Sequence, residues 1–375
     1  MELKGQQRGR GVQARCGYAR CPPGHPDPFV GHRLGGGTDD SSARCRHPVP
    51  RFPGETASWT MPLESGQRSA SGLNGPLAGF GTGEGTSSVA RSGTVVSCDS
   101  ACGRREMMFR GPCAALRAHV RGYFGYLESA AGRTCRVELS SGVVGLIVGF
   151  GPPVGIMYPC HGSGPTARVT SFVAGLHDSY AVAESTGLQH GVEIDLTPIG
   201  AHMLLGVPMD SVANRVVELE HVLGRFAARL VEQLHEAESW PARFDVLDAA
   251  IANRLAAARE PSPAISWAWR RLNETGGRLG IGALADELGS SRQYLVTRFR
   301  EEVGLPPKTL ARILRFQRAI RLLERADVAL LTRVARECGY YDQAHFNRDF
   351  RNFAGSTPRE FLARRLPDRG GVLCG

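Results

Sequence analysis

Residues 281–299 read IGALADELGSSRQYLVTRF, and residues 331–350 read LTRVARECGYYDQAHFNRDF. Each stretch has a short apolar-periodic segment with a central alanine, then a glycine, then a polar residue that opens a second periodic segment. The two polar residues, Ser291 and Asp342, lie 342 − 291 = 51 positions apart. Apolar residues recur at intervals of three, four and seven, which predicts two helices in each stretch.

The connection between the two predicted helices of each stretch is short. Gly289 and Gly339 suit a tight turn, because a residue without Cβ reaches positive φ at little cost. Ala285 and Ala335 are small enough to let the second helix cross the first closely. The polar residue after each glycine can cap the second helix with a side-chain oxygen. The sequence therefore predicts two helix-turn-helix units in tandem.

The outward face of each second helix carries side chains that suit base edges. Arginine suits O6 and N7 of guanine, glutamine and asparagine suit adenine, and small apolar groups suit the thymine methyl. The expected base-reading residues are Arg292, Gln293, Val296 and Thr297 in the first unit and Gln343, Ala344, Asn347 and Arg348 in the second. A solvated basic helix face is the alternative, which the helix-turn-helix register of both faces disfavours.

Residues 307–323, PKTLARILRFQRAIRLL, predict one continuous helix between the two units, with Pro307 in its first turn. A rigid connector of this kind would hold the two second helices roughly 34 Å apart, about one turn of DNA. The arginines of the connector are expected to contact phosphates or to pair with acidic residues. The expected phosphate contacts are Arg300, Arg312, Arg315 and Arg351.

These motifs resemble the AraC/XylS family of bacterial transcription regulators over residues 262–365. The likeness includes LRFQRA at 314–319, CGY at 338–340 with QAHF at 343–346, and TPREF at 357–361. It implies a sequence-specific regulator that acts on promoter or operator DNA, in contact with RNA polymerase, in the cytoplasm on the nucleoid. VAGLH at 173–177 and QHGVEIDLTPIGA at 189–201 are similar to the domain that precedes the helix-turn-helix units in such regulators. That likeness implies binding of a small effector and dimerisation, without assigning effector-binding residues.

Charge is unevenly distributed along the 375 residues. Residues 276–366 hold 17 Lys and Arg against 10 Asp and Glu, a balance of 17 − 10 = +7. Residues 107–275 hold 14 and 16, a balance of 14 − 16 = −2. A basic excess attracts the phosphate backbone whatever the base sequence. A non-specific or architectural DNA binder is therefore the alternative function.

Residues 1–106 contain 19 of the 47 Gly and 9 of the 23 Pro, with few apolar runs. Such a stretch buries too little apolar surface to offset its ordering entropy, so we expect a disordered tail. Met107 and Met108 directly precede the globular sequence, so a start assigned too far upstream is an equal alternative. No apolar run is long enough for a membrane helix.

The middle of the chain is predicted to be β-rich. Strand-like runs cover 134–139, 143–150, 169–176 and 190–196, and helical periodicity covers 116–127, 211–238 and 242–258. The expected fold class is therefore α+β with several domains. These are an N-terminal extension (1–106), a β-rich sensor or dimerisation domain with trailing helices (107–258), an all-α tandem helix-turn-helix domain (262–366) and a tail (367–375).

Enzymatic, cofactor and metal functions find little support. The ten cysteines form no CxxC pair, and His161, His177, His190 and His202 show no metal-site spacing. Pro159-Cys160-His161 has the form of a reactive-thiol motif in DNA alkyl-transfer proteins, which makes alkyl transfer by Cys160 a remote alternative. The residues after it depart from that motif. We expect no enzyme, no cofactor and no metal.

Overall fold

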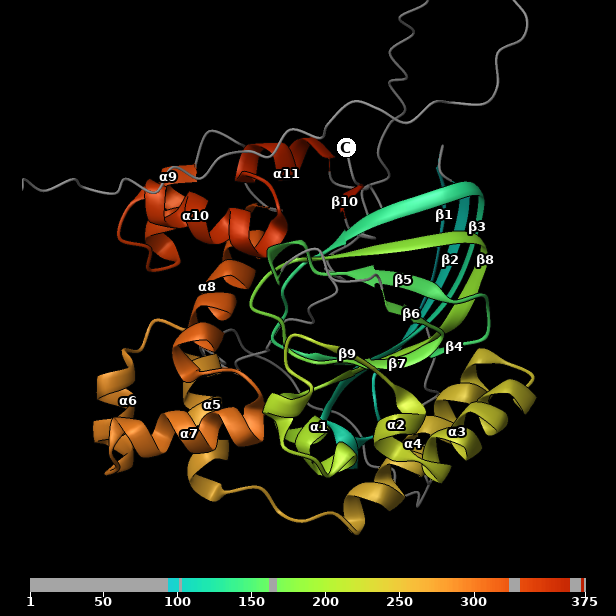
Figure 1. Ribbon diagram of the computed structural model, residues 1–375, viewed down its shortest axis with the longest axis horizontal. Helices are drawn as coiled ribbons and strands as arrows, with labels where there is room; N and C mark the ends of the chain where they lie inside the picture. Colours follow the sequence, from blue (N-terminus) through green and yellow to red (C-terminus); the bar gives the residue numbers. More distant parts are fainter. Residues whose placement is uncertain (1–93, 101–102, 162–166, 324–330, 365–371, 374–375) are drawn as a thin grey trace, which may run out of the picture. The chain divides into compact units, whose positions relative to one another are not determined.

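The computed structural model describes residues 94–100, 103–161, 167–323, 331–364 and 372–373. Within them the chain forms an antiparallel sheet followed by helices (Figure 1). The strands are β1 (Thr94–Ser100), β2 (Gly103–Arg110), β3 (Val120–Glu138), β4 (Val144–Gly149), β5 (Val154–Met157), β6 (Ala167–Val169), β7 (Ser171–Ala174), β8 (Ala181–Leu196), β9 (Val216–Glu218) and β10 (Val372–Leu373). Single 3₁₀ turns, η1 to η3, lie at Ala114–Leu116, Pro159–His161 and Met209–Ser211.

The long strands β3 and β8 organise the sheet, whose main path runs β1-β2-β3-β8-β4-β7-β9. One edge of β8 pairs with β3, with a register shift between Ser129 and Arg133. The other edge is shared, because β4 pairs with residues 191–196 and β5 pairs with residues 182–184. Side chains alternate along β8, so Val192, Ile194 and Leu196 enter the main core while Glu193 and Asp195 point to the opposite face. This alternation positions the cavity described below.

The helix expected at residues 116–127 is wrong, because most of this segment belongs to β3. Two glycines and three aromatic residues in the run GYFGY favour a strand over a helix. Gly125 has a specific role, since a Cβ there would lie 2.4 Å from the Trp240 ring that packs across the strand. The apolar spacing in this segment therefore comes from a strand with aromatic residues on both faces.

The sheet begins nearer the N-terminus than the expected boundary at residue 107. β1 pairs antiparallel with β2 from Thr94↔Phe109 to Ser100↔Gly103, and β2 pairs with β3. Residues 1–93 of the expected tail lie outside the described residues. At the other end, β10 pairs with β3 and adds part of the expected tail to the sheet.

Four helices follow β8, with β9 between the first and the second: α1 (Pro198–Leu205), α2 (Leu219–Leu223), α3 (Arg225–Glu236) and α4 (Trp240–Ala256). The predicted helical run 211–238 is interrupted by β9 and by Gly224, whose φ is 54°. α1 begins at Thr197, whose hydroxyl accepts a hydrogen bond from Gly200 N at 3.0 Å. It ends at Gly206 with φ 70°, a left-handed cap that glycine adopts at little cost.

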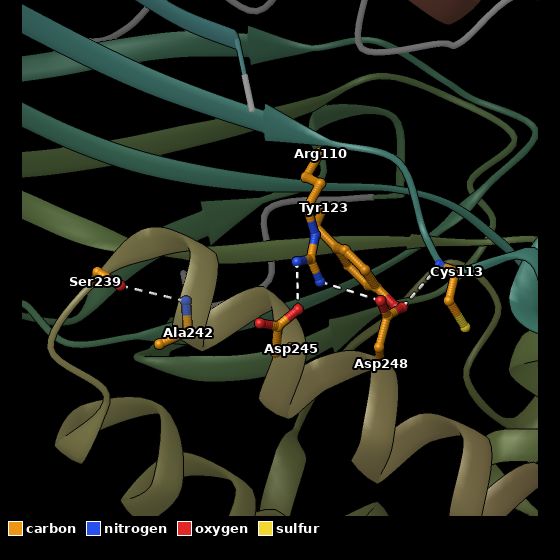
Figure 2. A network of polar contacts seen from close by, with 7 residues as sticks. All are labelled: Arg110, Cys113, Tyr123, Ser239, Ala242, Asp245 and Asp248. Carbon is orange, nitrogen blue, oxygen red and sulfur yellow. Dashed lines mark hydrogen bonds and ion pairs between the residues drawn. The ribbon is translucent and has the colours of Figure 1, made fainter. Parts of the chain in front are cut away.

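A buried polar network ties α4 to the sheet (Figure 2). Asp248 accepts hydrogen bonds from the Tyr123 hydroxyl at 2.8 Å, from Arg110 Nη2 at 3.1 Å and from Cys113 N at 3.0 Å. Arg110 also donates to Asp245 at 2.6 Å. Burial and the neighbouring Asp248 carboxylate raise the pKa of Tyr123 well above its usual range, which keeps the hydroxyl a donor.

The C-terminal domain is all-α. It contains α5 (Pro263–Glu274), α6 (Ile281–Leu288), α7 (Arg292–Val303), α8 (Pro307–Leu323), α9 (Leu331–Glu337), α10 (Gln343–Ala354) and α11 (Pro358–Arg364). The four expected helix-turn-helix helices and the continuous connecting helix are confirmed. Three phenylalanine rings fill its core, with Phe316 5.1 Å from Phe350 and 5.3 Å from Phe353 between ring centroids. No described helix is long and apolar enough to cross a membrane.

Candidate nucleic-acid interface

The first helix-turn-helix unit consists of α6 and α7. Gly289 lies between them with φ 65°, in the left-handed region that favours glycine. Ser291 then caps α7, its hydroxyl accepting a hydrogen bond from Tyr294 N at 3.1 Å. Leu284 and Leu295 are fully buried between the two helices. These contacts leave one face of α7 directed away from the core.

The second unit, α9 and α10, repeats this geometry. Gly339 has φ 79°, and the Asp342 carboxylate accepts a hydrogen bond from His345 N at 2.7 Å to cap α10. Phe346 and Phe350 point inward with no exposed surface. The caps and turn glycines expected from the sequence are confirmed in both units. We call α7 and α10 the recognition helices.

The structure gathers the eight expected base-reading residues on the outward faces of the recognition helices. On α7, Arg292, Gln293 and Thr297 are exposed, and Val296 is half-buried. On α10, Gln343, Ala344 and Arg348 are exposed, and Asn347 is half-buried. The Arg292 guanidinium lies over Gly282 of α6, where a Cβ would come within 2.5 Å of Nη2.

The four arginines expected at phosphates fall into two groups. Arg300 and Arg351 are exposed on the recognition helices. Arg312 and Arg315 of α8 are engaged inside the domain. Arg312 pairs with Asp349 at 2.7 Å, while Arg315 donates to Gly277 O at 3.0 Å and lies 5.7 Å from the Tyr340 ring centroid. The connector arginines were expected either to contact phosphates or to pair with acidic residues. Arg312 pairs with an acidic residue.

Two exposed tyrosines lie beside the base-reading residues and were not singled out from the sequence. Tyr294 of α7 is 47 % exposed, and Tyr341, directly before the α10 cap, is 92 % exposed. A tyrosine at an outward position of a predicted recognition helix is the sequence signal that would have found them.

The last turn of α10 contacts the β-sheet domain. Tyr180 N donates to Asn352 O at 3.1 Å, Ser140 N donates to Phe353 O at 3.2 Å, and Asn352 Nδ2 donates to Asp178 O at 2.5 Å. The base-reading residues of α10 lie in its first two turns. The contact therefore holds the second unit without using its reading face.

A cavity of about 290 Å³ lies between the inner face of the sheet and the C-terminal domain. Its apolar walls include Ile147, Ile156 and Phe172 from the sheet, with Phe316 from α8 and Phe361 from α11. Small-molecule sites have volumes from about 300 Å³ upward, so the cavity suits a small ligand. Helices α8 and α11 of the C-terminal domain thus form part of its wall.

The cavity also contains buried polar groups. Arg136 donates to both oxygens of Glu128 at 2.7 and 2.8 Å, and the Tyr158 hydroxyl is hydrogen-bonded to His177 Nε2. Burial raises the pKa of Asp195 to about 7, although a hydrogen bond with Glu193 and the charge of Arg121 act in the opposite direction. Sequence analysis missed these residues. The sequence signal that could have found the acidic pair is its spacing: Glu193 and Asp195 are two residues apart in a strand whose other face is apolar.

Cys160 lies on the surface in η2. Partial burial raises the pKa of its thiol, and the nearby Asp178 carboxylate adds to this, whereas a hydrogen bond with Ser179 lowers it. A nucleophilic thiol requires the opposite shift. The environment of Cys160 therefore does not support alkyl transfer. Among the described residues, no group of three or more His, Cys, Asp or Glu could hold a metal ion.

Residues 284–364 match a protein family described as a helix-turn-helix domain. The F1 operon positive regulatory protein of Yersinia pestis is 34 % identical over 89 residues, which are 24 % of this chain and 29 % of that protein. The transcriptional activator RhaS of Escherichia fergusonii is 29 % identical over 160 residues, which are 43 % of this chain and 49 % of that protein. The C-terminal domain is an AraC/XylS-type double helix-turn-helix domain.

The likeness is concentrated in this AraC/XylS-type domain, and the chain spans less than half the length of the curated relatives it matches. Among solved structures, ToxT from Vibrio cholerae resembles 64 % of this chain and 97 % of its own, with 13 % identity and a TM-score of 0.39. The relatives are regulators rather than enzymes.

Proposed function

We propose that this protein is a sequence-specific DNA-binding transcription regulator whose two recognition helices enter adjacent major grooves of promoter or operator DNA. The observation that carries the proposal is the pair of helix-turn-helix units with polar reading faces open to solvent, joined by one helix. Arg292 and Gln293 would read bases from α7, and Gln343 and Arg348 from α10. Val296, Thr297, Ala344 and Asn347 would complete the base contacts.

The connecting helix supports simultaneous use of the two units. α8 has 17 residues and is therefore about 26 Å long. Most of its apolar face is buried, which holds it in a fixed position against its neighbours. Arg300 and Arg351 would contact phosphates beside the two grooves. Arg312 and Arg315 would act mainly by stabilising the domain.

We propose further that a small effector modulates DNA binding from the cavity. Phe316, Gln317 and Ile320 of α8 line the same space as the sheet residues, so a ligand there would contact the helix that joins the two units. Different affinities of the ligand for two arrangements of α8 would couple the sites. Coupling of this kind is typically worth about 1–3 kcal/mol.

Contact with RNA polymerase, assembly as a homodimer and a place in the cytoplasm on the nucleoid belong to the same proposal. They are consistent with what the relatives are: a positive regulatory protein and a transcriptional activator.

In vitro selection from random duplex DNA by the full chain at near-physiological salt tests the proposed function. We expect two short enriched motifs with centres about ten base pairs apart. Selection with Arg292→Ala should relax one motif, and selection with Arg348→Ala should relax the other. Binding without enrichment that vanishes as salt rises would instead favour the non-specific, architectural alternative.

A further inference from the structure

The polar groups of the cavity have a charge pattern of their own. Four carboxyl side chains line it, from Glu128, Glu138, Glu193 and Asp195, against the single guanidinium of Arg136. Both terminal nitrogens of that guanidinium already donate to Glu128. Two of the four carboxyl groups, those of Glu193 and Asp195, lie on β8.

The Asp195 carboxyl group is buried and incompletely hydrogen-bonded. Its side chain is only 1 % exposed, and its Oδ2 has no hydrogen-bond partner among the described residues. A buried carboxyl oxygen without a partner is costly, because it has lost its hydration and gained nothing in exchange. The Arg121 charge acts on Asp195, but it does not outweigh burial. Oδ2 thus needs a donor that the protein does not supply.

The neighbouring Glu193 defines where such a donor would lie. Glu193 and Asp195 stand two residues apart on one face of β8 and share a hydrogen bond, which two ionised carboxylates cannot form. A cation placed between them would allow both to ionise. Gly145 of β4 lies opposite Asp195, and an added Cβ there would meet Ile147 Cδ1 at 3.3 Å and Glu193 Oε1 at 3.6 Å, so glycine keeps a side chain out of the space beside the acidic pair.

A second unpartnered group lines the cavity from α8. The Gln317 side chain is 8 % exposed, and its Nε2 has no acceptor among the described residues. Aliphatic and aromatic side chains, including Ile147, Ile156 and Phe172, form the apolar part of the lining. The cavity therefore combines an acidic pair, apolar walls and an amide that can donate a hydrogen bond.

We propose that the cavity binds a small organic amine, whose protonated nitrogen donates to Asp195 and Glu193 and whose apolar body lies among the sheet side chains and Phe316. An acceptor atom on the ligand receives the Gln317 amide hydrogen. This inference rests on the proposed function for its regulatory meaning, because it names the chemical class of the effector. The binding chemistry itself depends only on the cavity.

Three probes of matched size test the charge preference. The full chain is titrated calorimetrically with 4-phenylbutylamine, 4-phenylbutan-1-ol and 4-phenylbutanoate. These compounds differ only in the terminal group. We expect the amine to bind and to bind at least about tenfold more tightly than the alcohol, as hydrogen bonds to charged groups imply. Equal or tighter binding of the alcohol or the carboxylate, or no binding of the amine at millimolar concentration, would overturn the proposal.

Variants assign the binding to the acidic pair. Asp195→Asn and Glu193→Gln should each weaken amine binding about tenfold to a hundredfold. Asp210→Asn, which alters an exposed acid outside the cavity, should leave it unchanged. Glu193→Gln serves as the test if Asp195→Asn does not fold. Unchanged amine affinity in a folded variant of the pair would contradict the assignment.

The same preparation distinguishes this inference from the proposed function. Amine binding that depends on Asp195, in a protein that selects no DNA sequence, would retain the ligand chemistry and refute the regulator. Sequence-selective DNA binding without amine binding would retain the regulator and refute the amine.

Discussion

Arg312 donates hydrogen bonds from Nε and Nη2, at 3.1 and 2.7 Å, to the same carboxylate oxygen of Asp349. The Asp349 side chain is 2 % exposed, and the Arg312 guanidinium also lies 5.1 Å from the Phe353 ring centroid. The pair joins the connecting helix α8 to the recognition helix α10. The orientation of α10 relative to α8 therefore depends on a buried charge interaction as well as on apolar packing.

Arg312→Ala should destabilise the domain by about 2 kcal/mol, because it leaves the Asp349 carboxylate buried without its counter-charge. Urea unfolding of the full chain measures the change. Arg333→Ala is the matched control, since Arg333 is 70 % exposed in an i,i+4 pair with Glu337. Exposed pairs of that kind contribute no more than about 0.5 kcal/mol. Equal effects of the two changes would show that the buried pair has no special role.

Arg348→Ala should weaken DNA binding and relax base preference at one position by about 1–3 kcal/mol, because Arg348 lies exposed on the reading face of α10. Arg351→Ala, at the proposed phosphate contact, should weaken all sequences alike and flatten the salt dependence. The affinity of each variant is measured for the selected DNA sequence and for DNA with single base-pair changes. This comparison distinguishes base reading from phosphate contact. Uniform loss in both would refute base reading by Arg348.

Asp248→Ala should lower the free energy of unfolding by about 3 kcal/mol, because it removes the acceptor of three buried donors. Asp245→Ala is the matched control on the same arginine. Its side chain is 65 % exposed, so water can replace it and the loss should stay below about 1 kcal/mol. Thermal unfolding compares the two, and a larger loss for Asp245→Ala would contradict the network as described.

Asp195 should make stability depend on pH in the direction opposite to most carboxyl groups. Its folded pKa, about 7, lies above the ordinary value of 3.8 because of burial. Between those values the unfolded chain has released the proton while the folded chain keeps it, so stability falls as pH rises from about 4 to 7. Glu193 and Arg121 are the groups that act against this shift.

Asp195→Asn should remove that dependence. The difference in unfolding free energy between the variant and the parent protein should change in favour of the variant by about 2–4 kcal/mol when the pH is raised from 4.5 to 8. Urea unfolding at the two pH values provides the comparison, with Asp210→Asn as the exposed control. Parallel pH profiles for the parent protein and Asp195→Asn would show that the carboxyl titrates normally.

The sequence predicted the tandem units well because their signals are local. A glycine at each turn, a capping side chain three residues before its partner and helical apolar spacing all act within a few positions. Gly289, Gly339, Ser291 and Asp342 take the predicted roles.

Other features depend on residues distant in sequence. The strand at Tyr123 and Gly125 was predicted as a helix because Trp240, which packs on Gly125, lies more than a hundred residues away. Arg312 was expected to contact phosphate or to pair with an acidic residue, and no local pattern identifies its partner Asp349, 37 residues further on. The cavity likewise combines β8 with α8, a combination that no local pattern encodes.

The central claim is that one chain reads two successive grooves at a fixed spacing. It is tested most directly by inserting five base pairs between the two motifs of the selected site and measuring the affinity for the altered site. Five base pairs rotate one motif by about half a turn. The account predicts a loss of at least about a hundredfold, down to the affinity for a single motif, because α8 holds the recognition helices rigidly. Unchanged affinity would contradict simultaneous reading by α7 and α10.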